Sequence, residues 1–309
     1  MRWKLFPVVL TLISLAILAL IYSNDLIKVY RIREFYHTPE VSTLPPNPWR
    51  NFFYSTITKS EKQDFLQLLE LFKVQMEKHK INYTLFAGSL IGTIRHHGMI
   101  PWDDDIDILI NSSQKELLKT ALAEVNETHS LIFFPGKETS KWKFFKNTGL
   151  PYLHKPHRYP FLDLFFIRNH NATTLKVEVE NNFIHKNDMF PLINRNFEGI
   201  SLPSPCNAEK ILNNIYGSLN ICYSLPWNHS TEQSIHYSKQ YTVSCNSLYS
   251  LFGFVKRNEV TLLDRIDISE KLIKNNKTIQ IVRYSKPPLC SAEIENFESN
   301  LSMTKFQEL

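Results

Sequence analysis

The order of hydrophobic and polar positions along this chain predicts a mixture of helices and strands. Phe65, Leu68, Leu69, Phe72 and Met76 recur at helical spacing. They predict an amphipathic helix that begins with a capping box at residues 60–63 and ends near residue 80. Strands are expected at 81–86, 105–110, 131–134, 141–146 and 161–167, and shorter helices at 90–95 and 115–125. These elements predict an α/β (α+β) fold, in which helices flank a mixed sheet.

The N-terminal part of the chain has a different pattern. An apolar stretch from Phe6 to Tyr22 follows Arg2 and Lys4 and is about long enough for one transmembrane helix. Because no small-x-small cleavage site follows, we expect a retained signal anchor at residues 1–23. Residues 24–55 carry prolines at 39, 45, 46 and 48 without a helical period, and predict a stalk.

The glycosylation motifs suggest the secretory pathway, where the cysteines could form disulfides. The motif Asn-x-Ser/Thr is expected to accept glycans at Asn126, Asn171, Asn228, Asn276 and Asn300. Two further copies, at positions 82 and 111, fall in or at the end of expected strands. The cysteines at 206, 222, 245 and 290 allow three disulfide pairings, which the sequence leaves open. We therefore expect a single-pass type II membrane protein of the Golgi or endoplasmic reticulum, with a lumenal body.

The strongest chemical signal is the acidic run at Asp103, Asp104, Asp105 and Asp107. Like charges this close are unfavourable unless a cation or solvent compensates them. On a strand, Asp105 and Asp107 face the same side and suit a hard cation such as Mg²⁺ or Mn²⁺. A solvated acidic turn is the alternative. A calcium loop is excluded, because its sixth position is Ile108 and its twelfth is Gln114.

Two further features give this run a chemical context. Asp163 lies inside an apolar strand, where a charge needs a partner: either the same metals, or a turn or neighbouring arginine. Gly88 and Ser89 form a turn before a short helix, and such a turn offers backbone N–H groups to phosphate. Arg95 could reach the same phosphate or pair with the acidic run.

The run from Gly88 to Ile108 resembles the signature of the LicD family, which includes bacterial phosphocholine transferases, fukutin and fukutin-related protein. Residues 159–165 are similar to the family's second acidic strand, and shorter matches continue to Gly217. The resemblance implies a nucleotidyltransferase-like catalytic domain, which we place at 56–225. It leaves 226–309 as a C-terminal extension of unknown role. One departure is that Ser218 and Leu219 stand where the family usually has an acidic residue after Tyr-Gly.

The resemblance also implies an activity: transfer of a substituted phosphate, such as ribitol phosphate or phosphocholine, from a CDP-linked donor to a glycan hydroxyl, with release of CMP. In that scheme Asp105 and Asp107 hold the metals, with Asp103 at the edge, and Asp163 completes the site. Gly88 and Ser89 would cradle the diphosphate, with Arg95 as a further phosphate ligand.

Two other functions remain open at this stage. An Asp-x-Asp glycosyltransferase would use the same metals with a sugar nucleotide, and a non-catalytic member would bind glycans or partner enzymes. The net charge is +5, and the basic residues are scattered along the chain rather than clustered, so no nucleic-acid partner is expected. No feature of the sequence specifies an oligomer.

Overall fold

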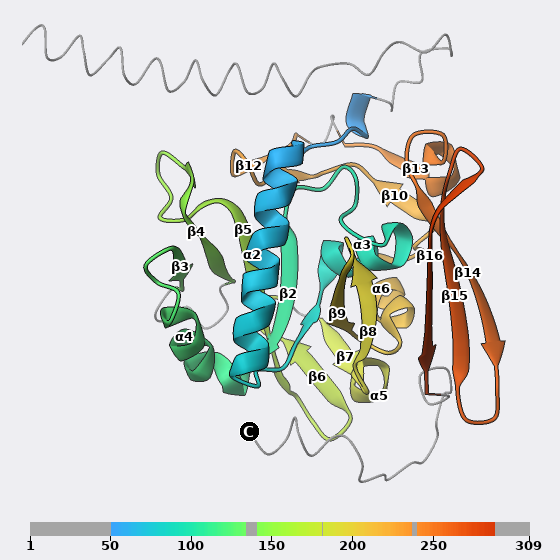
Figure 1. Ribbon diagram of the computed structural model, residues 1–309, viewed down its shortest axis with the longest axis horizontal. Coiled ribbons are helices and arrows are strands. Elements are labelled where there is room, and N and C mark those ends of the chain that lie inside the picture. The colour runs from blue at the N-terminus through green and yellow to red at the C-terminus, as the bar shows by residue number, and fades with distance from the viewer. Residues whose placement is uncertain (1–50, 134–140, 181, 237–239, 288–309) are drawn as a thin grey trace, which may run out of the picture. The chain divides into compact units, whose positions relative to one another are not determined.

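A computed structural model describes residues 51–133, 141–180, 182–236 and 240–287. They belong to one compact unit, Trp49–Leu309. Figure 1 shows its sheets and the helices beside them. The expected membrane segment Phe6–Tyr22 and most of the expected stalk lie outside the described residues. Within the described part of the chain, no helix is both long and apolar enough to cross a bilayer.

The central sheet contains both parallel and antiparallel strands. Its path is β1-β2-β5-β4-β3, and β6 extends it from β5 and pairs with β7. The bounds are β1 Tyr83–Leu85, β2 Ile106–Asn111, β3 His129–Ile132, β4 Trp142–Pro151, β5 Arg158–Asn169, β6 Thr174–Val177 and β7 Phe183–His185. Only β2 and β5 run parallel within this sheet, and all its other pairs are antiparallel. The predicted mixed sheet with flanking helices is confirmed.

The helices are α2 Lys59–Lys78, α3 Ala87–His96, α4 Lys115–Ala123, α5 Lys186–Met189 and α6 Ala208–Tyr216. A short 3₁₀ turn, η2 (Ser112–Gln114), precedes α4. The observed capping box, Thr58 with Glu61, lies two residues before the predicted one at residues 60–63. Thr58 caps α2, its hydroxyl accepts from the Glu61 N–H, and the Glu61 carboxylate accepts from the Thr58 N–H. The helix therefore begins at Lys59, because this earlier pair satisfies both backbone donors.

Alternation along β2 and β5 divides the interior into two cores. Ile106 and Ile108 of β2, with Leu164 of β5, pack in the core that contains the apolar faces of α2 and α4. Leu109 and Phe165 point to the other face of the sheet and pack with β6, α5 and α6. Asp107 and Asp163 share this second face, because they lie two residues before Leu109 and Phe165.

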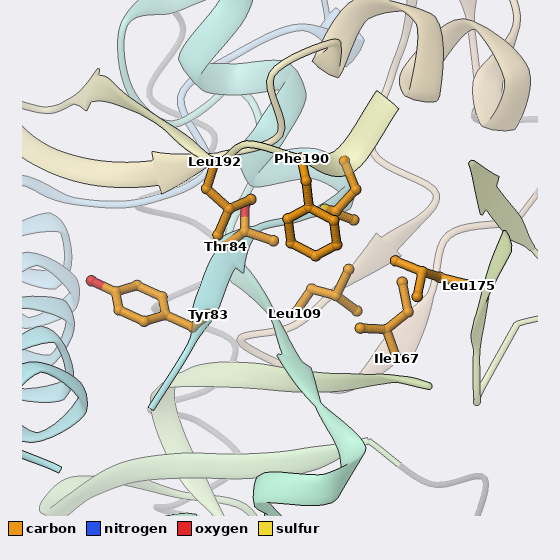
Figure 2. A pocket seen from close by; sticks show the side chains of 8 residues that line it. Tyr83, Thr84, Leu109, Ile167, Leu175, Phe190 and Leu192 are labelled. Carbon is orange, nitrogen blue, oxygen red and sulfur yellow. The ribbon is translucent and has the colours of Figure 1, made fainter. Parts of the chain in front are cut away.

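The second face also contains an apolar pocket, further along the same strands. Figure 2 shows the side chains that line it, and none of them is charged. They are Tyr83, Thr84, Leu109, Ile167, Leu175, Met189, Phe190 and Leu192. The pocket lies mainly within the second core, and no carboxylate, histidine or lysine lines it.

The C-terminal half forms four smaller sheets. Two hairpin-like pairs are β8 Ile193–Phe197 with β9 Ile200–Ser204, and β11 Trp227–Asn228 with β12 Gln233–Ser234. β10 Ile221–Tyr223 pairs with β13 Thr242–Ser244, which leads into η4 Cys245–Leu248. The strands β14 Phe254–Thr261, β15 Ile266–Lys274 and β16 Lys277–Lys286 form an antiparallel sheet. Figure 1 shows this last sheet in orange to red, separate from the central sheet.

A disulfide bond between Cys222 and Cys245 joins β10 to the start of η4. It decides among the three pairings that the sequence allowed. Cys206, which is buried, and Cys290, which lies outside the described residues, are the other two cysteines of the chain.

Candidate metal centre

Parallel pairing of β2 with β5 brings the two acidic segments together. Asp107 and Asp163 are direct partners in the register of these strands, and Asp105 lies just before β2 begins. Asp104, Asp105, Asp107 and Asp163 are all buried, and Asp163 is fully buried. The sequence prediction that Asp163 faces the acidic run from an adjacent strand therefore matches its position.

Gly88 and Ser89 contact this acidic group directly, and they lie in the first turn of α3 rather than in a turn before the helix as the sequence predicted. The Gly88 N–H lies 3.2 Å from Oδ2 of Asp107, and the Ser89 hydroxyl accepts from the Asp107 N–H at 2.8 Å. A Cβ atom on Gly88 would lie 2.6 Å from Oδ2 of Asp103. Ala87 has a φ of 42°, which is strained backbone for a residue with a side chain. The turn therefore fixes the acidic strand, with the N-terminal end of α3 beside its carboxylates.

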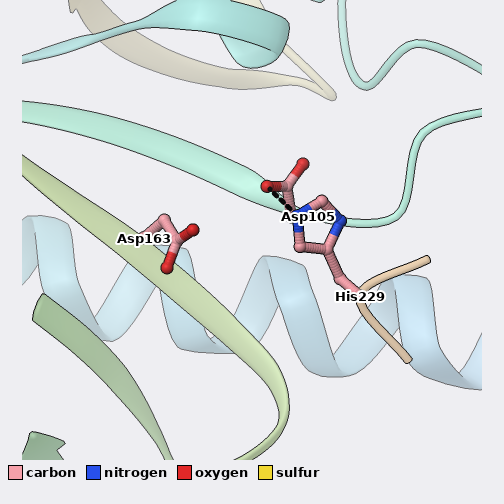
Figure 3. Close-up of side chains that lie close together, drawn as sticks. All are labelled: Asp105, Asp163 and His229. Atoms are coloured by element: carbon pink, nitrogen blue, oxygen red, sulfur yellow. Dashed lines mark ion pairs between the residues drawn. The ribbon is translucent and has the colours of Figure 1, made fainter. Parts of the chain in front are cut away.

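A loop from the C-terminal half completes the group. His229, between β11 and β12, places Nε2 3.2 Å from Oδ2 of Asp105 and Nδ1 2.7 Å from Oδ1 of Asp104. The second oxygen of Asp104 accepts from the His229 backbone N–H at 2.9 Å. Figure 3 shows the imidazole beside Asp105, with the Asp163 carboxylate nearby on β5.

Two lysines from β4 approach the other side of Asp163. Lys143 and Asp163 are register partners, and their Nζ and Oδ1 atoms lie 2.7 Å apart. Lys141 lies just before β4, with its Nζ 2.8 Å from Oδ2. Both oxygens of this carboxylate thus carry an ammonium partner.

Electrostatics differ within the acidic group. Burial, then the neighbouring carboxylates, raise the pKa values of Asp103 and Asp107 well above the usual range. Burial also raises the pKa of Asp105, although His229 opposes it. Burial acts the same way on Asp163, but Lys143 and Lys141 outweigh it and lower its pKa. The residues around Asp103, Asp105 and Asp107 do not supply enough positive charge to offset burial and the repulsion between these carboxylates.

The carboxylates also shift the pKa values of the basic groups beside them. Burial alone would lower the pKa of His229, but Asp105 and Asp104 raise it to about 10. The pKa of Lys141 is likewise raised, because Asp163 and Asp107 outweigh its burial. The electrostatic potential at this site therefore favours positively charged groups.

The donor atoms fit a divalent cation. One ligand atom each from Asp105, Asp163 and His229 lies within 4.8 Å of the others. Carboxylate oxygens suit Mg²⁺ and Mn²⁺, and an imidazole nitrogen favours the transition metal of the two. Asp107 lies outside this set of three, because its carboxylate is turned toward Gly88.

The guanidinium of Arg95 contacts β10 and the disulfide, although it still interacts electrostatically with Asp103. Its Nη1 is 3.3 Å from the Ile221 carbonyl oxygen, 3.4 Å from Sγ of Cys222 and 3.6 Å from Sγ of Cys245. Burial lowers its pKa to about 10. These contacts attach α3 to β10, and phosphate binding by Arg95 stays a prediction.

The expected glycosylation sites fall in different environments. Asn126, Asn171 and Asn276 are exposed, whereas Asn300 lies outside the described residues. Asn228 is half-buried, and its Oδ1 accepts from the Ser230 hydroxyl and from the N–H and hydroxyl of Thr231. Its side chain therefore shapes the loop that carries His229.

No motif in the sequence identified His229, Lys141, Lys143 or Glu232 as site residues. His229 and Glu232 belong to the segment that was set apart as an extension, and Glu232 Oε1 lies 3.7 Å from Nζ of Lys143. The only signal for Lys141 and Lys143 was their alternation on an expected strand at 141–146. For His229, no local pattern signalled a contact with residues more than a hundred positions earlier.

Comparison with known proteins gives a family match over the central part of the chain. The family described as "LicD/FKTN/FKRP, nucleotidyltransferase domain" matches residues 80–207. The lipopolysaccharide cholinephosphotransferase LicD of Haemophilus influenzae is 49% identical over 49 residues, which are 16% of this chain and 18% of that protein.

Two uncharacterised rickettsial proteins match over longer segments. The one from Rickettsia typhi is 24% identical over 167 residues, 52% of this chain and 48% of its own length. The one from Rickettsia prowazekii is 24% identical over 160 residues, 49% of this chain and 54% of its own. The chain thus spans about half the length of these two relatives, and less of the first.

The family match covers the turn at Gly88 and the acidic strands with Asp105, Asp107 and Asp163, but ends before His229. Residues 80–207 of this chain thus match the nucleotidyltransferase domain of the LicD family.

Proposed function

We propose that this protein is a metal-dependent phosphotransferase, which moves a substituted phosphate from a CDP-linked donor to a glycan hydroxyl and releases CMP. The observation that carries the proposal is the convergence of buried carboxylates from β2 and β5 on one face, beside the N-terminal end of α3. The match of residues 80–207 to the LicD family supports the reaction class, as does the cholinephosphotransferase activity for which the Haemophilus relative is named. Ribitol phosphate, phosphocholine and similar groups are the candidate cargo.

In this proposal Asp105, Asp163 and His229, the last with a deprotonated Nε2, would hold Mg²⁺ or Mn²⁺, with Asp103 and Asp107 beside them. The cation would neutralise charge on the phosphoryl and leaving oxygens. The acceptor oxygen bonds to the β-phosphorus, and the bond from that phosphorus to the bridging oxygen breaks to release CMP. Asp163, whose pKa is lowered chiefly by Lys143 once burial is overcome, stays a carboxylate. It would accept the hydrogen bond, and then the proton, of the acceptor hydroxyl.

The test is nucleotide release by the full chain with Mg²⁺ or Mn²⁺ and a mixed pool of glycan acceptors. CDP-ribitol, CDP-choline, CDP-glycerol, UDP-sugars and GDP-sugars are supplied separately. We expect CMP from one CDP donor and none after chelation. Release of UDP or GDP would instead support the glycosyltransferase alternative. A folded protein could also be inactive with every donor and show no rise in melting temperature with either metal. That result would favour a non-catalytic role.

We also propose that the protein is a type II glycoprotein of the Golgi or endoplasmic reticulum, anchored by its N-terminal apolar segment. The disulfide Cys222–Cys245 is typical of an oxidising compartment and supports this location. The exposed motifs at Asn126, Asn171 and Asn276 support it as well. Treatment with an N-glycosidase should lower the apparent mass, and replacement of these three residues by Gln should remove most of that shift. A mass unaffected by the enzyme would contradict the lumenal location.

A further inference from the structure

We propose that Lys141 and Lys143 bind the diphosphate of the donor, as the cationic side of the site opposite the carboxylates. The inference rests on the proposed phosphotransferase function and deepens it. It assigns to β4 the phosphate contacts that sequence analysis expected from the helix turn and Arg95.

The placement of the lysines follows from the sheet. Asp107, Asp163 and Lys143 form one row across the adjacent strands β2, β5 and β4. Lys141 lies two residues before Lys143, so the two side chains reach the same face. The row therefore continues from the carboxylates to the lysines on the face where the reaction would occur.

Their charge balance leaves room for an anion. Two ammonium groups contact the carboxylate of Asp163, at 2.8 and 2.7 Å, and the only other carboxylate paired with either of them in the described chain is Glu232, whose Oε1 lies 3.7 Å from Nζ of Lys143. Asp163 is also one of the three residues whose ligand atoms could hold a cation. A divalent cation on Asp163 would repel both ammonium groups unless an anion lay between them. The diphosphate of the donor is such an anion, because it must reach the metal and carries charge to match the lysines.

The two side chains are both held in place and accessible. The Lys143 ammonium lies 3.5 Å from the centre of the Phe161 ring, and that of Lys141 lies 4.7 Å from the centre of the Phe165 ring. Side-chain exposure is 35% for Lys141 and 13% for Lys143, against 1% for Asp163. The aromatic rings therefore hold both ammonium groups, and Lys141 is the more exposed of the two.

Other basic residues of the described chain fit this role less well. The guanidinium of Arg95 contacts a carbonyl oxygen and the disulfide sulfurs. His229 bridges two carboxylates. Lys155 lies 3.9 Å from Glu232 and does not contact Asp163. Lys141 and Lys143 are thus the lysines placed where phosphate would meet the metal.

The experiment compares binding of CDP and of cytidine to the full chain with Mg²⁺, by calorimetry. The variants are Lys141→Gln, Lys143→Gln and the double variant, and Lys146→Gln on the same strand serves as control. We expect each single change to weaken CDP binding about 10-fold and the double change about 100-fold, in line with charge-assisted hydrogen bonds. Cytidine affinity should be unchanged throughout. Lys143→Arg keeps the charge and should recover much of the CDP affinity.

A merely structural role would change the melting temperature or the Mg²⁺ response without separating CDP from cytidine. Equal CDP affinity in the double variant and the wild type would overturn the proposal, as would loss of cytidine binding in parallel with CDP. Absence of CDP binding by the wild-type protein would overturn it too.

The two proposals can fail separately. CDP binding that depends on the lysines, in a protein that transfers nothing from any CDP donor, would support the lysine site and contradict phosphotransfer. Transfer by the wild type, with an unchanged donor KM in the double variant, would support phosphotransfer and contradict the lysine site. With both proposals correct, the donor KM should rise more than kcat falls.

Discussion

Two buried acidic regions of this protein differ in how their charge is neutralised. At the interface of the C-terminal sheet, Glu270 is 2% exposed and is surrounded by donors. Arg195, Arg257 and Tyr284 lie within 3.0 Å of its Oε1, and His97 lies 3.1 Å from its Oε2. Burial opposes ionisation, yet these partners, with His97 and Arg257 first, lower the pKa of Glu270 to about 2.

In the acidic site, by contrast, carboxylates outnumber basic groups. Five carboxylates, at positions 103, 104, 105, 107 and 163, meet three basic groups, His229, Lys141 and Lys143. Burial and mutual repulsion raise the pKa values of Asp103 and Asp107. The folded protein therefore holds a group of charges that it does not neutralise itself.

The difference separates a structural ion cluster from a binding site. The Glu270 cluster joins His97 at the end of α3 and Arg195 of β8 to all three strands of the C-terminal sheet, and it is complete without a ligand. A bound cation would bring the acidic site to a similar balance. Buried charge alone thus says little about function, whereas the balance of charge within each region indicates which one binds a ligand.

The largest expected effect comes from removing one charge from the acidic site. Asp107→Asn keeps the shape of the side chain, and its amide oxygen can still accept from Gly88. We expect CMP release to fall at least about 100-fold, because a charge placed to act in the transition state is lost. Without metal, the melting temperature should stay the same or rise, because repulsion decreases. Retained activity, measured beside the Lys146→Gln control, would contradict this role of Asp107.

The matched change in the Glu270 cluster should act on stability instead. Glu270→Gln leaves Arg195 and Arg257 without their buried carboxylate, and should lower the free energy of unfolding at pH 7 by about 3 kcal/mol. A shift from the usual 4.5 to about 2 corresponds to a similar amount. Urea denaturation measures the loss, and activity per folded molecule should be kept.

The pH dependence of this loss follows from the sign of the shift. Because folding lowers the pKa of Glu270, its contribution to stability is present above pH 4.5 and disappears as the pH falls toward 2. The difference between the wild type and Glu270→Gln should therefore shrink over that interval. A difference that is constant from pH 7 to pH 3 would show that the carboxylate charge is not its source.

The sequence predicted local features better than distant ones. Alternation at residues 105–110 and the lone acid in 161–167 led to β2, β5 and their shared face, because strand period is a local property. The approach of His229 to Asp105 depends on the path of the chain between them, and no periodicity encodes that path. The cap of α2 was misplaced because Thr58–Glu61 and Ser60–Gln63 both have capping-box form, and only the fold selects one.

The smallest expected effect tests how closely the helix turn fits the acidic site. In Gly88→Ala, the new Cβ would lie 2.6 Å from Oδ2 of Asp103, so that carboxylate must turn away. The clash involves the end of a side chain, and we expect a stability change below about 1 kcal/mol. CMP release should nevertheless fall about 10-fold, since a small displacement at a reacting centre reduces the rate. In an Asp103→Ala background the clash no longer exists, and Gly88→Ala should then add little. If the two losses are additive instead, Gly88 acts on the reaction through its own backbone rather than through Asp103.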